Sequence, residues 1–567
     1  MVRKHKGKLE LDWVDKGDII VTKFDDKGKT YPASYFRGQV TDEELMPREL
    51  ELIETVGDPD AGNMLIWGEN LIALRSLEKD FAGKIKLIYI DPPFNTGQDF
   101  EDYEDGLEHS IWLSMMENRL RLAKRMLKKD GAIFVHIDIR EMPYLKSLMD
   151  EIFGRDNILA LITLKVKDPA GVGQQSVIFD ICEYVISYAF DYTIFKDQLQ
   201  HRGFSFEEVE GFVKGYSKAI INFGKNHLVK TIQRGQVGQI KIYEHKNYEI
   251  KIFKKGSSFD EYVNHFETVF ADYNPSGGMI LAIREQLPAN GLSSIEYVPI
   301  KGRDAGKMVR VFFLNRRILA WLKDVVELKN DKTMIKRQKL SNLWEVITAS
   351  LPAEGSVYLP QGKKPEALLK KIIELTTDEK DYILDFFAGS GTTGAVAHKL
   401  GRKWIMVEIR EDMVREKALQ RLKNVVNGDP TGISKEVGWK GGGGFKFYKL
   451  SEPIIVPHKN YSSIKIINPK YHNTALIKVI CNLEGFKFKK GDKIFHGVNK
   501  LGNKYAHITE QYVSQTYVDV LKSKLADNEE LIIYCFNYDE KIDLPLNILI
   551  RKLPGDLGKP YQLRLGI

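Results

Sequence analysis

The 567 residues suffice for about two to four domains, and the 43% hydrophobic and 28% charged residues are typical of a soluble globular protein. No apolar run reaches the roughly 20 residues that a membrane helix needs, no apolar segment follows the basic start as in a secretory signal, and the three cysteines form no CxxC pair. The sequence thus argues against a membrane partner, a disulfide framework and a metal site; we expect a cytoplasmic protein, and the modest net charge of +7 matters less than its distribution.

The first half of an α/β core is predicted between residues 61 and 192. Residues 1–60 precede it as a polar lead-in with weak strand signals. The apolar runs at 86–90 and 132–137 are short and continuous, which is typical of buried parallel strands. The elements expected in chain order are a strand at 63–67, a helix at 69–77, a strand at 86–90, a helix at 110–129, and strands at 132–137 and 183–189.

The alternation of strands and helices breaks down at 193–345, which we predict to be an inserted domain. Between Lys214 and Lys255, ten basic residues are accompanied by only two acidic ones and by five interleaved aromatic residues. Such a segment favours binding to a polyanion, although a solvated lysine-rich face explains it equally well. The candidate DNA-binding residues in this segment are Lys225, Lys230 and Arg234.

The alternation resumes at 346–437, the predicted second half of the core. The expected elements are a helix that follows Lys364-Pro365-Glu366 and runs to about 375, a strand at 382–386, a helix at 392–400 and a strand at 404–408. The glycine-rich stretch at 438–444 is interpreted as a flexible link or a tight loop. Residues 438–567 are predicted to form a strand-rich α+β region, to which the sequence assigns no role.

The motif Asp91-Pro92-Pro93-Phe94 directly follows the buried strand at 86–90. Two consecutive prolines fix the backbone and remove N–H donors, so carbonyl groups here can face a ligand. Asp91 supplies an acceptor at the carboxyl end of a strand, where open α/β sheets bind ligands, and Phe94 supplies a flat apolar face. Together they suit an amino group on a flat heterocycle; the simpler interpretation is a turn with a buried phenylalanine. We predict that these four residues are catalytic.

A glycine-rich loop, Asp385-Phe386-Phe387-Ala388-Gly389-Ser390-Gly391-Thr392-Thr393-Gly394, joins the strand at 382–386 to the next helix. Glycines let the backbone approach a ligand closely, and we expect a Cβ atom at Gly391 to fill space that the ligand needs. Glu408 ends the following strand, where a carboxylate can hold two ribose hydroxyls. The spacing also matches the GxGxxG of dinucleotide enzymes, but Asp385 and the separate motif at Asp91 favour another nucleoside-containing cofactor.

These motifs resemble those of the amino-methylating DNA methyltransferases. Asp91 to Phe94 is similar to their DPPY-type catalytic motif, with Phe94 in place of the commoner tyrosine, and Phe387 to Gly391 is similar to their FxGxG cofactor motif. Lys364-Pro365-Glu366 resembles the KPE element that precedes the latter. The order of the motifs, with a large insertion between them, resembles the β group, in which the insertion is the target-recognition domain. Stretches at 91–97, 106–115 and 438–450 resemble the modification subunits of type III restriction-modification systems.

The resemblance implies a Rossmann-like methyltransferase core with a mostly parallel, seven-stranded sheet, an inserted target-recognition domain and S-adenosylmethionine as cofactor. It also implies double-stranded DNA as substrate, a homodimer, and a separate restriction subunit, since the chain has no GxxxxGKT or GxxxxGKS P-loop for helicase activity. The implied cofactor-binding residues are Lys364, Pro365, Asp385, Phe387, Ala388, Gly389, Ser390, Gly391, Thr392 and Glu408.

The target base follows partly from chemistry and partly from the resemblance. Methylation of cytosine C5 needs a nucleophilic cysteine, and no cysteine of this chain lies in a Pro-Cys loop. The adenine enzymes of the family usually carry Asp at the first motif position and the cytosine N4 enzymes usually carry Ser, so Asp91 implies the N6 amine of adenine, with cytosine N4 as the alternative. A DNA-binding scaffold with an inactive core and an RNA methyltransferase remain as further interpretations.

The implied reaction requires the target base to leave the DNA helix, because its amine is otherwise paired. Asp91 and the carbonyl of Pro92 would accept hydrogen bonds from the amine while Phe94 stacks on the ring. The methyl group would then transfer in line through positioning and electrostatics, without a metal ion or a covalent intermediate. His109 and His136 lie near the motifs but are interpreted as packing or capping residues.

Overall fold

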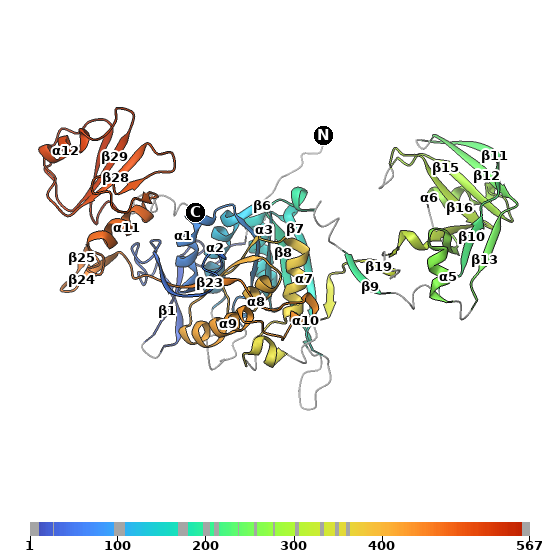
Figure 1. The fold of residues 1–567 in the computed structure, drawn as a ribbon, viewed down its shortest axis with the longest axis horizontal. Helices are drawn as coiled ribbons and strands as arrows, with labels where there is room; N and C mark the ends of the chain where they lie inside the picture. Colours follow the sequence, from blue (N-terminus) through green and yellow to red (C-terminus); the bar gives the residue numbers. More distant parts are fainter. Residues whose placement is uncertain are drawn as a thin grey trace. The chain divides into compact units, whose positions relative to one another are not determined.

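The computed structural model divides into two compact units, Met1–Arg202 with Asn342–Ile567, and Gly203–Ser341 (Figure 1). The second unit falls within the range 193–345 that the sequence analysis assigns to an inserted domain. The residues that the structure describes are 11–25, 28–95, 108–167, 180–196, 204–208, 215–235, 238–254, 258–275, 278–300, 305–328, 334–345, 351–358 and 363–557.

The first unit is built on a ten-stranded sheet in which β8 is antiparallel to both its neighbours, β3 is antiparallel to β23, and all other neighbours are parallel. The strand order is β20 (Leu343–Glu345), β7 (Ile158–Lys165), β8 (Cys182–Ala189), β6 (Leu127–Ile137), β5 (Ile85–Ile90), β21 (Tyr382–Asp385), β22 (Lys403–Glu408), β4 (Met64–Trp67), β23 (Gly444–Leu450) and β3 (Leu50–Gly57).

The number of strands differs from the predicted seven. The seven strands from β7 to β4 all come from 61–192 and 346–437, and four of the six pairs between them are parallel. The additional strands β20, β23 and β3 extend the sheet at both edges. β3 gives a weak signal in the sequence because it is an edge strand with several exposed positions, among them Leu52 and Ile53. What we predicted to be part of a polar lead-in is thus part of the sheet.

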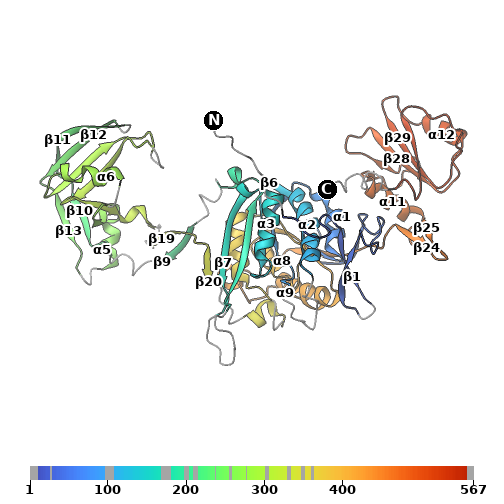
Figure 2. The ribbon, with the colours of Figure 1, turned by 180° about the vertical axis from the view of Figure 1, so that it is seen from behind.

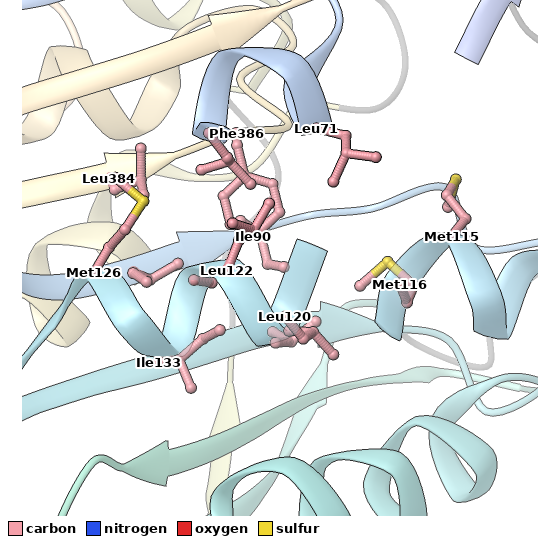
Figure 3. Packing of buried hydrophobic residues seen from close by; sticks show 14 of the residues in the cluster. Leu71, Ile90, Met115, Met116, Leu120, Leu122, Met126, Ile133, Leu384 and Phe386 are labelled. Carbon is pink, nitrogen blue, oxygen red and sulfur yellow. The ribbon is translucent and has the colours of Figure 1, made fainter. Parts of the chain in front are cut away.

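Helices cover both faces of this sheet, and neighbouring strand residues pack into different cores. Leu384 packs with α1 (Asn70–Phe81), α2 (His109–Met126) and α3 (Met142–Phe153). Ile383 packs instead with α7 (Glu366–Thr376), α8 (Thr392–Lys399) and α9 (Leu419–Val426). Successive side chains of a strand point to opposite faces, so continuously apolar strands give a three-layer α/β/α arrangement. Figure 3 shows part of the first core, in which Leu120, Leu122 and Met126 of α2 pack with strand residues such as Ile90.

The glycine-rich stretch at 438–444 forms a tight loop. Gly441, Gly442 and Gly443 all have positive φ angles, which residues with a Cβ rarely adopt. The carbonyl of Gly442 accepts a hydrogen bond from His398, and that of Gly443 accepts one from the N–H of Asp58. These contacts fix the start of β23 within the ten-stranded sheet.

The C-terminal region has a smaller sheet of its own, in the order β26-β27-β28-β29-β30, whose last three strands are parallel. Its elements are β24 (Ile455–His458), β25 (Tyr461–Ile467), α11 (Asn473–Leu483), β26 (Lys487–Phe488), β27 (Gly497–Val498), β28 (Lys504–Thr509), α12 (Gln515–Lys522), β29 (Glu530–Cys535) and β30 (Ile548–Lys552). A further hairpin near the N-terminus pairs β1 (Ile20–Phe24) with β2 (Thr30–Ser34). Within the described ranges, no helix has both the length and the apolar character needed to cross a membrane.

The second unit is an antiparallel β-structure, drawn mainly in green in Figures 1 and 2. An eight-stranded sheet follows the order β11 (Lys225–Arg234), β12 (Gly238–Lys246), β15 (Leu292–Tyr297), β16 (Val309–Leu314), β17 (Arg317–Trp321), β14 (Val269–Tyr273), β10 (Lys218–Asn222) and β13 (Glu249–Ile252). The other elements are a small sheet of β18 (Val326–Leu328), β19 (Met334–Lys339) and β9 (Phe204–Glu208), and the helices α5 (Phe259–Asn264) and α6 (Gly278–Ile283).

Candidate active site

Three carboxylates lie at the carboxyl ends of three neighbouring parallel strands. Asp91 directly follows β5, Asp385 ends β21 and Glu408 ends β22. The chain leaves β5 through α2 towards β6, whereas it leaves β21 through α8 towards β22 on the other side. Open α/β sheets bind ligands at such a reversal of strand order. The fold therefore brings together the two motifs, although nearly 300 residues separate them in the sequence.

The motif Asp91–Phe94 contacts a cation from the other half of the core. The Nζ atom of Lys364 lies 3.5 Å from Oδ1 of Asp91 and 4.5 Å from the ring centroid of Phe94. The carbonyl of Pro93 accepts a hydrogen bond of 2.9 Å from the indole of Trp112, so the Pro92 carbonyl is the better candidate acceptor for a ligand. Lys364 is predicted from the sequence to bind the cofactor, whereas the structure places its ammonium group beside Asp91 and Phe94.

A second carboxylate, Glu183 at the start of β8, holds the same ammonium group. Its Oε2 atom lies 3.1 Å from Nζ of Lys364 and 2.6 Å from Nε2 of His136. The other ring nitrogen of His136 lies 3.0 Å from the hydroxyl of Tyr89. The His136 ring is buried, with its centroid 5.8 Å from that of Phe94. The cluster thus extends from Asp91 and Phe94 to β6 and β8.

The electrostatics of this cluster follow from burial and close opposite charges. Burial raises the pKa of Asp91, while the charge of Lys364 opposes the rise. Burial acts to lower the pKa of Lys364, but Asp91 and Glu183 outweigh it and raise that pKa. For Glu183, burial acts upward, whereas Lys364 and His136 bring its pKa below the ordinary value. Glu183 and Lys364 are therefore both charged at neutral pH.

The glycine-rich loop is positioned by Asp385 and Glu408. The buried carboxyl group of Asp385 accepts hydrogen bonds from the N–H of Phe387 at 2.9 Å and from the hydroxyl of Thr393 at 2.6 Å. Burial raises the pKa of Asp385 to about 7. The carboxylate of Glu408 accepts a hydrogen bond of 2.8 Å from the N–H of Gly389 and lies within the same strand-end edge. Burial also raises the pKa of Glu408.

Two glycines of the loop have positive φ angles but different surroundings. A Cβ atom at Gly391 would lie 3.2 Å from Cα of Ala418, so it would meet the protein itself and not a ligand, contrary to our expectation. At Gly389 a Cβ atom would meet no protein atom within 4 Å. Gly389, and not Gly391, is therefore the glycine whose missing side chain leaves open space. The two positions differ because the backbone of the loop directs the Cα–H bonds of Gly389 and Gly391 to different surroundings, and the sequence does not reveal this.

The hydroxyl groups of Ser390 and Thr392 face a buried arginine of α9. Nη1 of Arg421 lies 2.7 Å from Oγ1 of Thr392 and 3.5 Å from Oγ of Ser390, and Nη2 lies 2.8 Å from Oε1 of Glu366. Glu366 follows Pro365, the residue that caps α7, and it also contacts Nζ of Lys399 at 2.9 Å. This ion-pair network connects the KPE element to the glycine-rich loop.

The three candidate DNA-binding residues lie on β11, at the edge of the eight-stranded sheet in the second unit. A β-bulge between Leu228 and Lys230 shifts the register by one residue. Without it, Lys225 and Lys230 would point to opposite faces; with it, Lys225, Lys230 and Arg234 share one face. Their partners on β12 are Lys246, Ile242 and Gly238. Lys225 and Lys230 are exposed and Arg234 is half-buried.

Glu183 and Arg421 are not predicted from the sequence, and His136 is interpreted there only as a packing or capping residue. Glu183 was detectable as a lone carboxylate in an otherwise apolar strand, although its partner Lys364 lies 181 residues away. Arg421 gave no comparable signal, because a basic residue on an amphipathic helix is usually solvent-exposed.

The family model of the N6_N4_Mtase DNA methylases matches residues 85–419, a range that begins with β5 and ends in α9. It therefore contains both motifs and the insertion between them.

Individual relatives agree with this match. The probable type III restriction-modification enzyme HindVI Mod subunit of Haemophilus influenzae is 38% identical over 415 residues, which cover 69% of this chain and 54% of that protein. The StyLTI Mod subunit of Salmonella typhimurium is 29% identical over 369 residues, covering 58% and 49%. The chain thus spans about half the length of these curated relatives. Among solved structures, a putative DNA modification methylase from Thermus thermophilus aligns with a TM-score of 0.32 and 12% identity, covering 69% of this chain and 100% of that one.

Proposed function

Since this chain belongs to the N6_N4_Mtase family of DNA methylases, we propose that it transfers a methyl group from S-adenosylmethionine to the exocyclic N6 amine of a flipped-out adenine in duplex DNA. The observation that carries the proposal is the position of the Asp91 and Phe94 motif, at the end of a strand that neighbours the strand leading to the glycine-rich loop.

The chemistry follows from the groups at this edge. The target adenine leaves the helix and stacks on Phe94, and its amine donates hydrogen bonds to Asp91 and to the carbonyl of Pro92. These bonds favour a nitrogen lone pair that is no longer delocalised into the ring. The N–C bond forms as the C–S bond breaks, and the carboxylate of Asp91 accepts the proton that the nitrogen loses. Pro93 fixes the backbone between Pro92 and Phe94.

The described residues fit S-adenosylmethionine, whose sulfonium supplies an activated methyl group. We propose that Gly389 provides open space, that the half-buried Phe387 and the buried Ala388 line it, and that Glu408 holds ribose hydroxyls. Asp385 shapes the loop through its two hydrogen bonds. Ser390, Gly391 and Thr392 contribute through the backbone, because Arg421 holds both hydroxyls and Ala418 lies beside Gly391. Pro365 starts the helix that carries Glu366.

The inserted range 193–345 is proposed to read the DNA site, with Lys225, Lys230 and Arg234 on phosphates. The similarity to two type III Mod subunits supports a modification and specificity role in a restriction-modification system. A homodimer and a separate restriction subunit with helicase and nuclease activity are part of this proposal, as is a cytoplasmic location, where both cofactor and DNA are found.

The experiment is transfer of labelled methyl groups to unmethylated genomic DNA, followed by digestion to nucleosides. Label in N6-methyl-2′-deoxyadenosine that disappears with Asp91→Ala supports the proposal. We expect this substitution to cost about a hundred- to a thousandfold in rate while cofactor affinity is retained, by analogy with the loss of one preorganised hydrogen-bonding group. Label in N4-methylcytosine would overturn the base assignment. An inactive wild type that still binds DNA would indicate a DNA-binding scaffold. Label found only in RNA would show that RNA, and not DNA, is the substrate.

A further inference from the structure

We propose that Lys364 is a residue of the catalytic site, where its ammonium group is the charge partner of Asp91, and that Glu183, held by His136, positions that ammonium group. This inference rests on the methyltransferase function proposed above. It gives a role to three residues that the motif at Asp91 does not include.

The ammonium group of Lys364 occupies the place proposed for the target amine. It lies 3.5 Å from Oδ1 of Asp91 and 4.5 Å from the ring centroid of Phe94. These are the two groups proposed to hold the target amine, one by a hydrogen bond and the other by stacking. An ammonium group and an adenine cannot fill one space, so Lys364 must shift when the base arrives.

Glu183 is already in place as a partner for the shifted ammonium group. Glu183 is closer to Nζ than Asp91 is, at 3.1 Å against 3.5 Å. His136 is buried and fixes Glu183 through a contact of 2.6 Å, and Tyr89 in turn contacts His136 at 3.0 Å. Lys364 can therefore turn from Asp91 towards Glu183 without leaving the cluster or losing its ion pair.

The charge of this cluster suits the reaction. With both carboxyl groups ionised, the three side chains of Asp91, Glu183 and Lys364 together carry a net charge of −1 beside the reacting amine. Methyl transfer brings positive charge onto the amine nitrogen, and a negative surrounding stabilises it. Without Lys364, two carboxylates would face each other; without Glu183, the charge would fall to zero. Among the described residues, the titratable groups that act on Asp91 are Lys364, His136, Glu183, Tyr89 and Asp385.

The experiment measures kcat/KM against pH for methyl transfer to unmethylated genomic DNA. Lys364→Met should move the acidic limb of the profile upward by roughly 1–3 pH units, because Asp91 loses its nearby cation. Glu183→Gln should move it downward, because Asp91 loses a repelling neighbour and keeps the whole charge of Lys364, and it should lower the plateau rate. The double variant restores a net charge of −1, so its limb should lie between those of the single variants.

The matched control is Lys371→Met on α7, the helix that begins two residues after Lys364, since Nζ of Lys371 lies 4.2 Å over the ring of Trp344, outside the cluster. Its profile should equal that of the wild type. If both single variants slow the reaction without moving the limb, or if the losses in the double variant simply add, the inference is wrong. If Lys364→Met does not fold, the downward shift of Glu183→Gln alone decides. A wild type without methyl transfer would instead refute the proposed function, so the two failures are distinguishable.

Discussion

The hydroxyl group of Thr393 donates a hydrogen bond of 2.6 Å to Oδ2 of Asp385, across the turn from the end of β21 to the first helical residues of α8. The same carboxyl group is buried, and burial raises its pKa to about 7, well above that of an aspartate in an unfolded chain. Asp385 thus links the shape of the glycine-rich loop to the pH of the solution.

This linkage predicts how stability depends on pH. A raised pKa means that the folded protein binds the proton more tightly than the unfolded chain, so the contribution of Asp385 to stability is present below about pH 4 and is lost as the pH rises towards 7. The free energy of unfolding should fall over this range by up to about 1.4 kcal/mol per pH unit. Asp385→Asn should remove this slope in urea unfolding, whereas Asp527→Asn, at an exposed position, should not. Equal slopes in all three proteins would contradict the prediction.

Phe94 is expected to act as a flat surface and not through a hydroxyl group. Phe94→Ala should weaken capture of the extruded base by about 1–3 kcal/mol, the usual value of one stacking contact. Phe94→Tyr keeps the ring and should retain most of the activity. The measurement is kcat/KM for labelled methyl transfer to genomic DNA in both variants. Similar losses in the two would show that the ring face does not matter.

The two loop glycines should respond differently to the same substitution. Asparagine tolerates positive φ better than most residues, so Gly389→Asn should add a side chain to open space with modest strain and should weaken S-adenosylmethionine binding. Gly391→Asn would press on Ala418 and should lower the melting temperature more strongly. Calorimetric titration and thermal unfolding separate the two effects. Unchanged cofactor affinity in folded Gly389→Asn would disprove our placement of the cofactor.

The edge strand β11 should contribute to DNA binding through its charges. Replacing Lys225, Lys230 and Arg234 by alanine should reduce the salt dependence of DNA affinity by about one unit of slope for each phosphate that is no longer bound, without an effect on cofactor binding. Lys241→Ala is the matched control, because the register places it on the opposite face of the same hairpin. A triple variant with the wild-type slope would leave β11 as a solvated face.

The central strands of the fold were predictable because their signals are local. The apolar runs at 86–90 and 382–386 lie within one residue of the observed β5 and β21. β3 and β7 were not singled out: β3 is a half-exposed edge strand, and β7 has several half-buried positions and borders the antiparallel β8. Such strands depend on pairing partners far along the chain, which periodicity does not reveal.

The candidate site was predictable as two motifs but not as one cluster. Asp91 and Phe94 follow from the chemistry of a strand end, whereas the position of Lys364 depends on how α7, which begins two residues after it, packs beside β5. A Cβ atom would meet open space at Gly389 and Ala418 at Gly391, and this difference depends on the backbone of a single turn. Both are properties of three-dimensional packing, and the DNA-binding residues and domain limits remain predictions.

The chain leaves the ten-stranded sheet for the second unit after β8 and returns to it at β20. These strands flank β7, so both junctions lie at the same edge of the sheet, two strands or more away from β5 and β21. A replacement of the whole second unit would therefore break no backbone pairing of the strands that carry Asp91 and Asp385. Under the proposed function, this layout would let one methyl-transfer centre be combined with different DNA-reading units through exchange of a single contiguous segment.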